Sequence, residues 1–266
     1  MSRRTSTQER YNVIVVGAGF AGQSCVRTLA NSDTSVLLIE QSANFHRKVC
    51  AEGMTRQDCS FISDRFMTTQ FKPVTIHHNS HTAIIGKTHG AIATFDRSGF
   101  LRQGMEEIRK LKNVDVMVGA CVSDIIDRST LRLSDGRTIS FDYLVGADGA
   151  RSVVRQFLDL PVKNTAVAVQ YTCPVTHPDF ELHLRDDFES YFWVFPHRSY
   201  TTIGCGAEIS VRSPQQARRD LDNFMKMHNF PIETSTLEAA TLTFDYRGYA
   251  FGNIYLAGDA AGLMSG

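Results

Sequence analysis

The sequence predicts an α/β fold in which a Rossmann-like parallel sheet carries an inserted antiparallel sheet. Three observations support this prediction. A β-branched run at 13–16 leads into the glycine-rich turn 17–22, a helical stretch and a second buried strand, which is the order of a βαβ unit. A second glycine-rich strand-to-helix turn follows at 146–152. Alternating, β-branched segments at 71–76 and 82–87 are typical of antiparallel strands, and 162–207 is rich in predicted strands.

The first glycine-rich turn has the features of a dinucleotide site. Gly17 permits a tight turn, Gly19 lets a phosphate approach the backbone, and Gly22 allows the helix to pack closely on its strand. The helix N-terminus offers N–H groups and a positive dipole end to a pyrophosphate. Glu40 ends the second strand, where a carboxylate accepts from a ribose hydroxyl and disfavours a 2′-phosphate. The predicted ligand is therefore FAD or NAD rather than NADP, and the alternative is a glycine-rich turn without a ligand.

Composition excludes several classes of protein. Of 266 residues, 42% are hydrophobic and 21% charged, which is ordinary for a globular protein. Lys plus Arg equals Asp plus Glu at 28 each, so no net charge favours nucleic acid or an acidic membrane surface. Six cysteines show no CxxC spacing, and neither a signal peptide nor a membrane-spanning stretch is predicted. These features predict a cytoplasmic protein, with residues 1–10 as a disordered tail.

The segment after the first βαβ unit predicts a loop, a helix and a small sheet. The polar loop 41–53 contains Arg47 and Cys50 and is expected beside the bound cofactor. Thr55 has the character of an N-cap and predicts a helix through Phe66. Strands are predicted at 71–76, 82–87 and 90–95, which together form a small antiparallel sheet.

The middle of the chain returns to the parallel sheet. A helix is predicted from Asp96 or Ser98 through Lys112, followed by a third parallel strand at 114–118. An Asp-Gly turn at 135–136 between alternating runs predicts a hairpin. A buried strand at 143–145 then enters the second glycine-rich turn, and a helix follows at 153–158.

The last part is strand-rich and ends in a third glycine-rich turn. Ser213 at an N-cap with Pro214 at the first helical position predicts a helix to about residue 228. A strand is predicted at 237–244. A short strand then leads into Gly-Asp-Ala-Ala-Gly at 258–262.

Taken together, the three glycine-rich stretches carry a family resemblance. Gly-x-Gly-x-x-Gly at 17–22 with Glu40, Gly-Ala-Asp-Gly-Ala-Arg-Ser at 146–152 and the 258–262 motif resemble the FAD-dependent oxidoreductases of the p-hydroxybenzoate hydroxylase type over nearly the whole chain. Tyr-Phe-Trp-Val-Phe-Pro at 191–196 resembles the Tyr-x-Trp-x-Phe-Pro stretch of geranylgeranyl reductases, and 47–53 resembles their Cys-Gly-Gly loop, with Ala-Glu in place of Gly-Gly. Aromatic hydroxylases lack this pair, and flavin halogenases have Trp where Tyr191 stands.

The resemblance implies a cofactor, two domains and a set of binding residues. The cofactor is FAD, with NAD(P)H or ferredoxin as electron donor. Residues 11–70, 96–160 and 252–266 would form the FAD-binding domain, and 71–95 and 161–251 the substrate domain. Asp259 would accept from a ribityl hydroxyl, Arg97 would reach the phosphates, and the backbone at Val122 would pair with adenine. The implied cofactor-binding residues are Gly17, Gly19, Phe20, Ala21, Gly22, Glu40, Arg47, Arg97, Val122, Asp148, Gly149, Gly258, Asp259 and Gly262.

The implied function is reduction of carbon-carbon double bonds in a prenyl-like or other apolar substrate. The flavin supplies the chemistry, so no catalytic side chain is assigned; the pocket candidates are Cys50, Tyr191 and Trp193. Cys50 is read either as a redox thiol or as a small packing residue, and the two aromatic residues either as pocket walls or as core. Asp148 has the alternative reading of a turn residue. The alternative activity is an FAD-dependent monooxygenase of the aromatic hydroxylase or halogenase type.

Two further expectations concern a metal and the end of the sequence. Histidines 77, 78 and 81 are candidate metal ligands. However, neighbouring residues of a strand point to opposite faces, and no carboxylate or cysteine follows them in the sequence, so no metal is predicted. Relatives of this type continue past the Gly-Asp motif with helices that face the flavin and the substrate. A second alternative is therefore a truncated FAD-binding chain without turnover, whose uncovered sheet associates with itself or with a partner chain.

Overall fold

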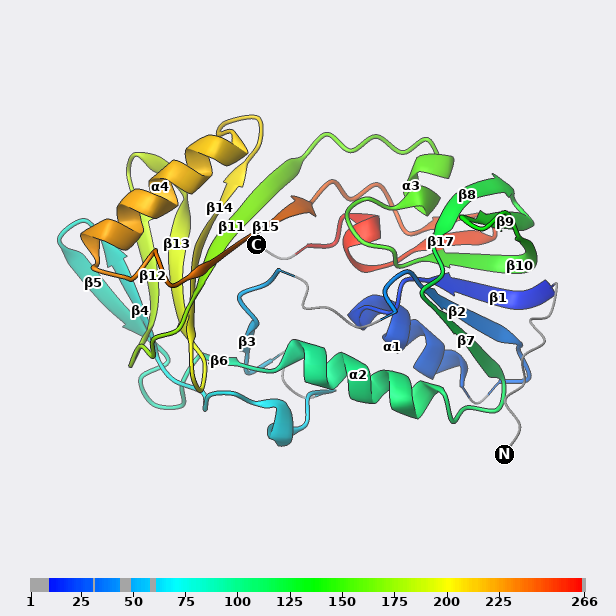
Figure 1. The fold of residues 1–266 in the computed structure, drawn as a ribbon, viewed down its shortest axis with the longest axis horizontal. Helices are drawn as coiled ribbons and strands as arrows, with labels where there is room; N and C mark the ends of the chain where they lie inside the picture. The colour runs from blue at the N-terminus through cyan, green and yellow to red at the C-terminus, as the bar shows by residue number, and fades with distance from the viewer. Residues whose placement is uncertain (1–9, 31, 44–48, 58–60, 265–266) are drawn as a thin grey trace. The chain divides into compact units, whose positions relative to one another are not determined.

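The computed structural model describes residues 10–30, 32–43, 49–57 and 61–264. The chain divides into two compact units, which are described separately. The first unit comprises Met1–His46, Leu101–Asn164 and Thr243–Gly266, and the second comprises Arg47–Phe100 and Thr165–Leu242. Arg47 and nearly all of the predicted tail lie outside the described residues. One unit is built on a largely parallel sheet and the other on a largely antiparallel one, so the predicted α/β class is confirmed (Figure 1).

The first unit is organised around parallel strands whose carboxyl ends align. Val16 on β1 lies beside Ile39 on β2 and beside Gly146 on β10, and Gly146 in turn pairs with Leu256 on β17. A predicted site residue ends each of these strands or follows it within two residues. The strands are, in spatial order, β16 (Ala250–Phe251, antiparallel), β17 (Ile254–Leu256), β10 (Thr138–Gly146), β1 (Arg10–Val16), β2 (Val36–Glu40) and β7 (Val114–Val118).

Both faces of this sheet are covered, as its near-continuous apolar strands require. On one face, α1 (Phe20–Leu29) and α2 (Arg97–Ile108) bury Val26, Met105 and Ile108 against the strands (Figure 1). On the other, Val122, Leu131 and Val154 pack from β8 (Val122–Asp127), β9 (Thr130–Leu133) and α3 (Val153–Phe157). The predicted hairpin around the Asp-Gly turn is confirmed, because β9 pairs antiparallel with β10 and Gly136 adopts a φ of +88°.

The second unit is a seven-stranded sheet with α4 (Pro214–Met227) across one face (Figure 1). Ser213 caps α4 in a capping box with Gln216, and Pro214 takes the first position, so the predicted helix start is confirmed. Phe224 on α4 stacks on Phe192 of the sheet, with ring centroids 4.6 Å apart. The strands are, in spatial order, β15 (Thr236–Thr243), β11 (Thr165–Cys173), β14 (Thr201–Glu208), β13 (Phe188–Pro196), β12 (Phe180–Arg185), β4 (Val74–His78) and β5 (His81–Ile85).

Two local predictions in this unit are wrong. The helix predicted from Thr55 through Phe66 is absent from the described residues of that segment; Thr55 instead ends β3 (Gly53–Thr55), and a single 3-10 turn, η2, spans Asp64–Phe66. The cause is long-range, because Met54 pairs with Ala93 on β6 (Ile92–Thr94). That pairing also separates β6 from the small sheet predicted for residues 71–95, whose other two strands join the large sheet.

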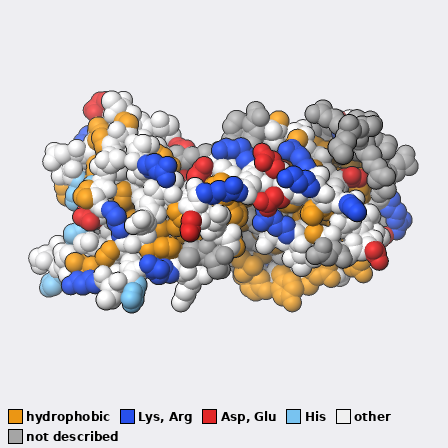
Figure 2. All heavy atoms as spheres, turned by 90° about the horizontal axis from the view of Figure 1, so that it is seen from below, with side chains coloured by type: hydrophobic (Ala, Val, Ile, Leu, Met, Phe, Trp, Pro, Cys, Tyr) orange, Lys and Arg blue, Asp and Glu red, His pale blue; other side chains and the backbone are white. Residues whose placement is uncertain are grey.

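The surface is consistent with the balanced charge. On the face drawn in Figure 2, basic and acidic side chains are interspersed. Among the described residues, no helix combines the length and the apolar character needed to cross a bilayer.

Candidate functional site

Three glycine-rich turns meet at the carboxyl ends of the parallel strands in the first unit. A Cβ atom on Gly17 would overlap the carbonyl oxygen of Ala147 in the second turn, and Gly17 has a φ of +97°. A Cβ on Gly258 would lie 2.9 Å from the Cβ of Ala21 in the first turn. Only glycine allows these backbones to approach so closely. The carboxyl edge of an open parallel sheet is where such folds bind nucleotides.

The first turn leaves room beside its middle glycine. No atom of the described residues lies within 4 Å of the position that a Gly19 Cβ would occupy, whereas a Cβ on Gly22 would overlap the carbonyl oxygen of Gly17. Gly19 is the N-cap of α1, and no side chain among the described residues caps this helix. Open space therefore borders Gly19 at the positive end of the helix dipole, as a pyrophosphate requires.

Glu40 stands beside this turn at the end of β2. Its Oε2 accepts from the backbone N–H of Ala18 at 2.8 Å, and its Oε1 accepts from that of Ser42 at 2.8 Å. A carboxylate has about four acceptor positions, so both oxygens retain capacity for ribose hydroxyls.

The second turn holds Asp148 in an unusual state for a carboxylate. Its Oδ2 accepts from the N–H of Val153 at 2.8 Å, at the start of α3, while its buried Oδ1 has no partner among the described residues. Burial raises the pKa of Asp148 above its ordinary value. A residue that only forms a turn does not require a buried carboxyl oxygen without a partner. Such an oxygen is consistent with a group that takes part in ligand binding. Gly149 beside it has a φ of +80°.

The third turn is tied to the second by Arg155, which sequence reasoning missed. Its buried guanidinium donates to the carbonyl oxygens of Ala260 at 3.2 Å and Asp245 at 2.6 Å. Both partners are about 100 residues from Arg155 in the sequence, so no local sequence pattern predicts these contacts. Gly262 follows η3 (Gly258–Ala261) with a φ of +75°, and a Cβ there would lie 2.6 Å from the backbone of Asp245.

Two predicted cofactor residues belong to other segments of the chain. Val122 begins β8 with its side chain buried in the core, so only its backbone is available to a ligand. The neighbouring carbonyl of Cys121 already accepts from the N–H of Ser134. Arg97 begins α2 within the second unit.

In the second unit, the predicted pocket residues lie on the sheet face opposite α4. Phe192 and Val194 of β13 pack toward α4, so the alternating residues Tyr191, Trp193 and Phe195 point to the other face. Trp193 covers Gly204 on β14, where any Cβ would overlap the indole ring. The indole N–H of Trp193 is buried and has no partner among the described residues. Burial raises the pKa of the half-buried Tyr191 phenol.

The loop that contains Cys50 lies on this same face. Gln170 of β11 donates to the carbonyl oxygen of Cys50 at 3.3 Å, and a Cβ on Gly53 would lie 2.7 Å from the ring of Phe195. The structure thus brings together Cys50 and the aromatic stretch, which are about 140 residues apart in the sequence. Gln170 also donates to Glu238 at 3.0 Å, so this aromatic face carries polar groups that the sequence did not single out.

Glu52 replaces a glycine of the family loop and keeps a glycine-like backbone. Its φ is +57°, and its side chain is 3% exposed. Tyr200 donates to its carboxylate at 3.3 Å, and the ring of Tyr200 stacks on His197, which lies 3.2 Å from the carbonyl oxygen of Ala51. These contacts stabilise Glu52 in a left-handed backbone conformation, which glycine adopts without a steric cost.

Comparison with known families identifies the cofactor. Residues 11–154 match the pyridine nucleotide-disulphide oxidoreductase family, and residues 125–266 match the FAD binding domain family, each more than half of the chain. The chain belongs to the FAD-dependent oxidoreductases. The three glycine-rich turns lie within the matched segments, so the cofactor of this oxidoreductase is FAD.

The proteins similar to this chain include both reductases and monooxygenases. Digeranylgeranylglycerophospholipid reductase of Methanococcus vannielii is 24% identical over 97% of this chain and 72% of its own length. The FAD-dependent monooxygenase ntnJ of a Nectria species is 26% identical, over 58% of this chain and 39% of its own length. A geranylgeranyl bacteriochlorophyll reductase-like protein from Thermoplasma acidophilum has the same fold, with a TM-score of 0.83 at 20% identity over 96% of this oxidoreductase and 72% of that protein.

Proposed function

We propose that this oxidoreductase reduces a carbon-carbon double bond of a prenyl-like or other apolar substrate. The observation that carries the proposal is the placement of Tyr191, Trp193 and Phe195 on one sheet face, with the Cys50 loop packed on that face. Aromatic side chains dominate sites for apolar ligands, and a few polar groups orient the ligand. The reductases among the relatives are consistent with this proposal because their names specify geranylgeranyl substrates.

The first unit would hold FAD through its three turns. The N–H groups of α1 and the space at Gly19 would accept the pyrophosphate, and Glu40 the adenosine ribose. Asp259, at the start of η3, would accept from a ribityl hydroxyl. Bound FAD supplies hydride transfer, while the protein supplies binding, orientation and exclusion of water. The proposed binding residues also include Phe20, Ala21, Arg47, Arg97, Val122, Asp148 and Gly149.

A monooxygenase is the second candidate, and a specific observation favours it. The buried Oε1 of Gln170 has no partner among the described residues, and Gln170 lies on the same face as the aromatic side chains. The phenol hydroxyl of an aromatic substrate would donate a hydrogen bond to that oxygen.

Product analysis with and without oxygen separates the two candidates. Purified protein with FAD and a chemical reductant is incubated anaerobically with a geranylgeranyl lipid, and in parallel aerobically with phenols. The proposal expects saturated lipid without oxygen, and Trp193→Ala should lower that yield while Tyr143→Phe, an exposed tyrosine in the other unit, should not. Product that requires both oxygen and a phenol would establish the monooxygenase instead.

A further inference from the structure

Four histidines gather around one carboxylate on the α4 side of the second unit. His183 Nε2 lies 2.8 Å from Glu181 Oε2, and His177 Nε2 lies 3.8 Å from Glu181 Oε1. His77 stacks on His183 with ring centroids 4.5 Å apart, and the ring of His228 at the end of α4 lies 4.9 Å from that of His183. The side chains of Glu181 and His183 are only 19% and 12% exposed. The cluster is separate from the aromatic face, because His183 contacts Phe224 of α4.

The pairing register of two strands brings these residues together, and that register cannot be predicted from the sequence. β4 and β12 pair in parallel with His77 beside His183. Glu181 precedes His183 by two residues and therefore shares its face. No carboxylate lies near residues 77–81 in the sequence, because the carboxylate of this cluster comes from a strand about 100 residues away.

Two of these imidazoles have a hydrogen-bond partner at their Nδ1 atom. The buried Nε2 of His77 has no partner among the described residues, while its Nδ1 lies 3.3 Å from the hydroxyl of Thr82. The Nδ1 of His177 lies 3.0 Å from the carbonyl oxygen of Asp179 and 3.4 Å from its backbone nitrogen, while the Nε2 lies 3.8 Å from Glu181 Oε1. Histidines that bind metals hold their second nitrogen in this manner. A buried nitrogen without a partner destabilises the fold unless a ligand satisfies it.

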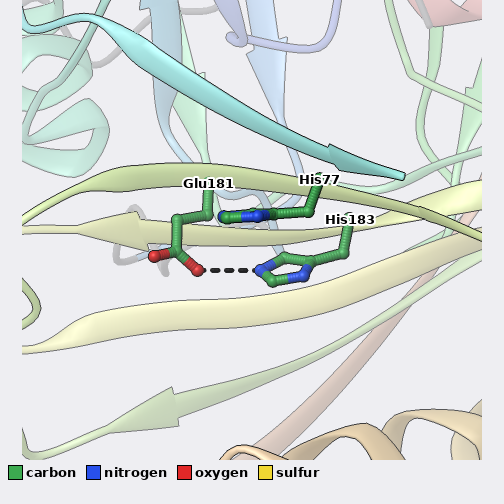
Figure 3. A group of neighbouring side chains, drawn as sticks. All are labelled: His77, Glu181 and His183. Atoms are coloured by element: carbon green, nitrogen blue, oxygen red, sulfur yellow. Dashed lines mark hydrogen bonds and ion pairs between the residues drawn. The ribbon is translucent and has the colours of Figure 1, made fainter. Parts of the chain in front are cut away.

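We propose that His77, Glu181 and His183 form a divalent transition-metal site that prefers Zn²⁺, with His177 as the fourth ligand. One donor atom from each of the first three lies within 4.8 Å of the others (Figure 3). Tetrahedral zinc with bonds of about 2.0–2.1 Å needs donors about 3.3 Å apart, a contraction that side-chain rotation supplies. Two imidazoles and a carboxylate suit zinc, whereas magnesium and calcium prefer oxygen ligands alone.

Metal binding would join parts of the unit that lie far apart in the chain. The metal would replace the proton that His183 Nε2 shares with Glu181, and that proton would leave to solvent. β4 and its partner β5 form the exposed edge of the sheet, so the metal would fasten this edge to β12. The expected role is structural, and it is independent of the reaction at the flavin.

Calorimetry with a matched pair of variants tests the site. Tag-free, FAD-loaded protein is freed of metal with a chelator and titrated with Zn²⁺. We expect one equivalent to bind with a Kd of about 1 μM or tighter, and His77→Gln to weaken binding by about 100-fold. His78→Gln is the control, because His78 is the next residue of β4, is exposed and pairs with Asp186. Equal affinity in both variants, or no binding by the unaltered protein, would overturn the proposal.

A second measurement needs no substitution and therefore does not depend on a variant that folds. In protein labelled with ¹⁵N-histidine, Zn²⁺ should shift the ring nitrogen resonances of His77, His177 and His183 and leave those of His78 and His81 in place. Unchanged resonances at His77 and His183, or shifts at His78 and His81 as large as those at His77 and His183, would show that the cluster is only a packed histidine network.

Discussion

Replacement of the middle glycine of the first turn separates cofactor binding from folding. Gly19 has a φ of −70° and no described atom within 4 Å of its missing Cβ, so alanine fits without strain. Gly19→Ala should change the free energy of unfolding by no more than about 1 kcal/mol, and in the stabilising direction, since glycine is the more flexible residue in the unfolded chain. The added methyl would occupy the space through which the FAD pyrophosphate approaches the helix. Gly19→Ala should therefore lose at least one charged hydrogen bond to the pyrophosphate. Loss of one such bond weakens FAD binding by about 1.5–3 kcal/mol, or about 10- to 150-fold in Kd.

The neighbouring and the remote glycines supply the controls for this experiment. Gly17→Ala combines a φ of +97° with overlap on Ala147 and should destabilise the fold by about 2–5 kcal/mol. Gly136→Ala, in the hairpin turn, has a φ of +88° but open space, so it should cost only about 1–2 kcal/mol and leave FAD affinity unchanged. Urea unfolding without FAD measures stability, and flavin fluorescence measures Kd. Wild-type FAD affinity in folded Gly19→Ala protein would refute the placement of the pyrophosphate.

Three more predictions concern single side chains. Glu40→Arg should weaken FAD by about 1.5–3 kcal/mol before repulsion is counted, and an unchanged Kd by fluorescence titration would misplace the ribose. Burial raises the folded-state pKa of Asp148 above its unfolded value, so its ionisation lowers stability as the pH rises through the folded value. Asp148→Asn should therefore gain stability relative to wild type as the pH rises in urea unfolding, and a difference that does not vary with pH would contradict this reasoning. Burial raises the pKa of Cys205 to about 12, so this thiol should react with a disulfide reagent only after unfolding. The exposed Cys121 should react in the native protein. Mass mapping that finds Cys205 modified in the native protein would be inconsistent with its burial.

Features set by neighbouring residues could be predicted from the sequence. The strand-turn-helix pattern at 13–29, the Asp-Gly hairpin and the helix start at Ser213 and Pro214 depend on residues within a few positions, and the structure confirms each of them. The three glycine-rich turns themselves were visible in the sequence, and the structure aligns them because carboxyl ends of parallel strands share one edge of a sheet.

Features that depend on long-range pairing could not be predicted. Thr55 has the local character of a helix cap, but pairing of β3 with β6 makes it the end of a strand. Arg155 resembles any helical arginine until its contacts with Asp245 and Ala260 are known. The histidine cluster exists only because β4 pairs with β12 in parallel, although β12 pairs antiparallel with β13 and β4 pairs antiparallel with β5.

Single-turnover oxidation of the reduced flavin tests the central claim most directly. Protein with FAD is reduced anaerobically, mixed with either a geranylgeranyl lipid or its fully saturated counterpart, and followed by flavin absorbance. We predict that the unsaturated lipid oxidises the flavin in the absence of oxygen, at a rate that rises with its concentration, and that the saturated lipid does not. Reduced flavin that stays reduced with both lipids, and is oxidised only when oxygen is admitted, would contradict the assignment as a double-bond reductase.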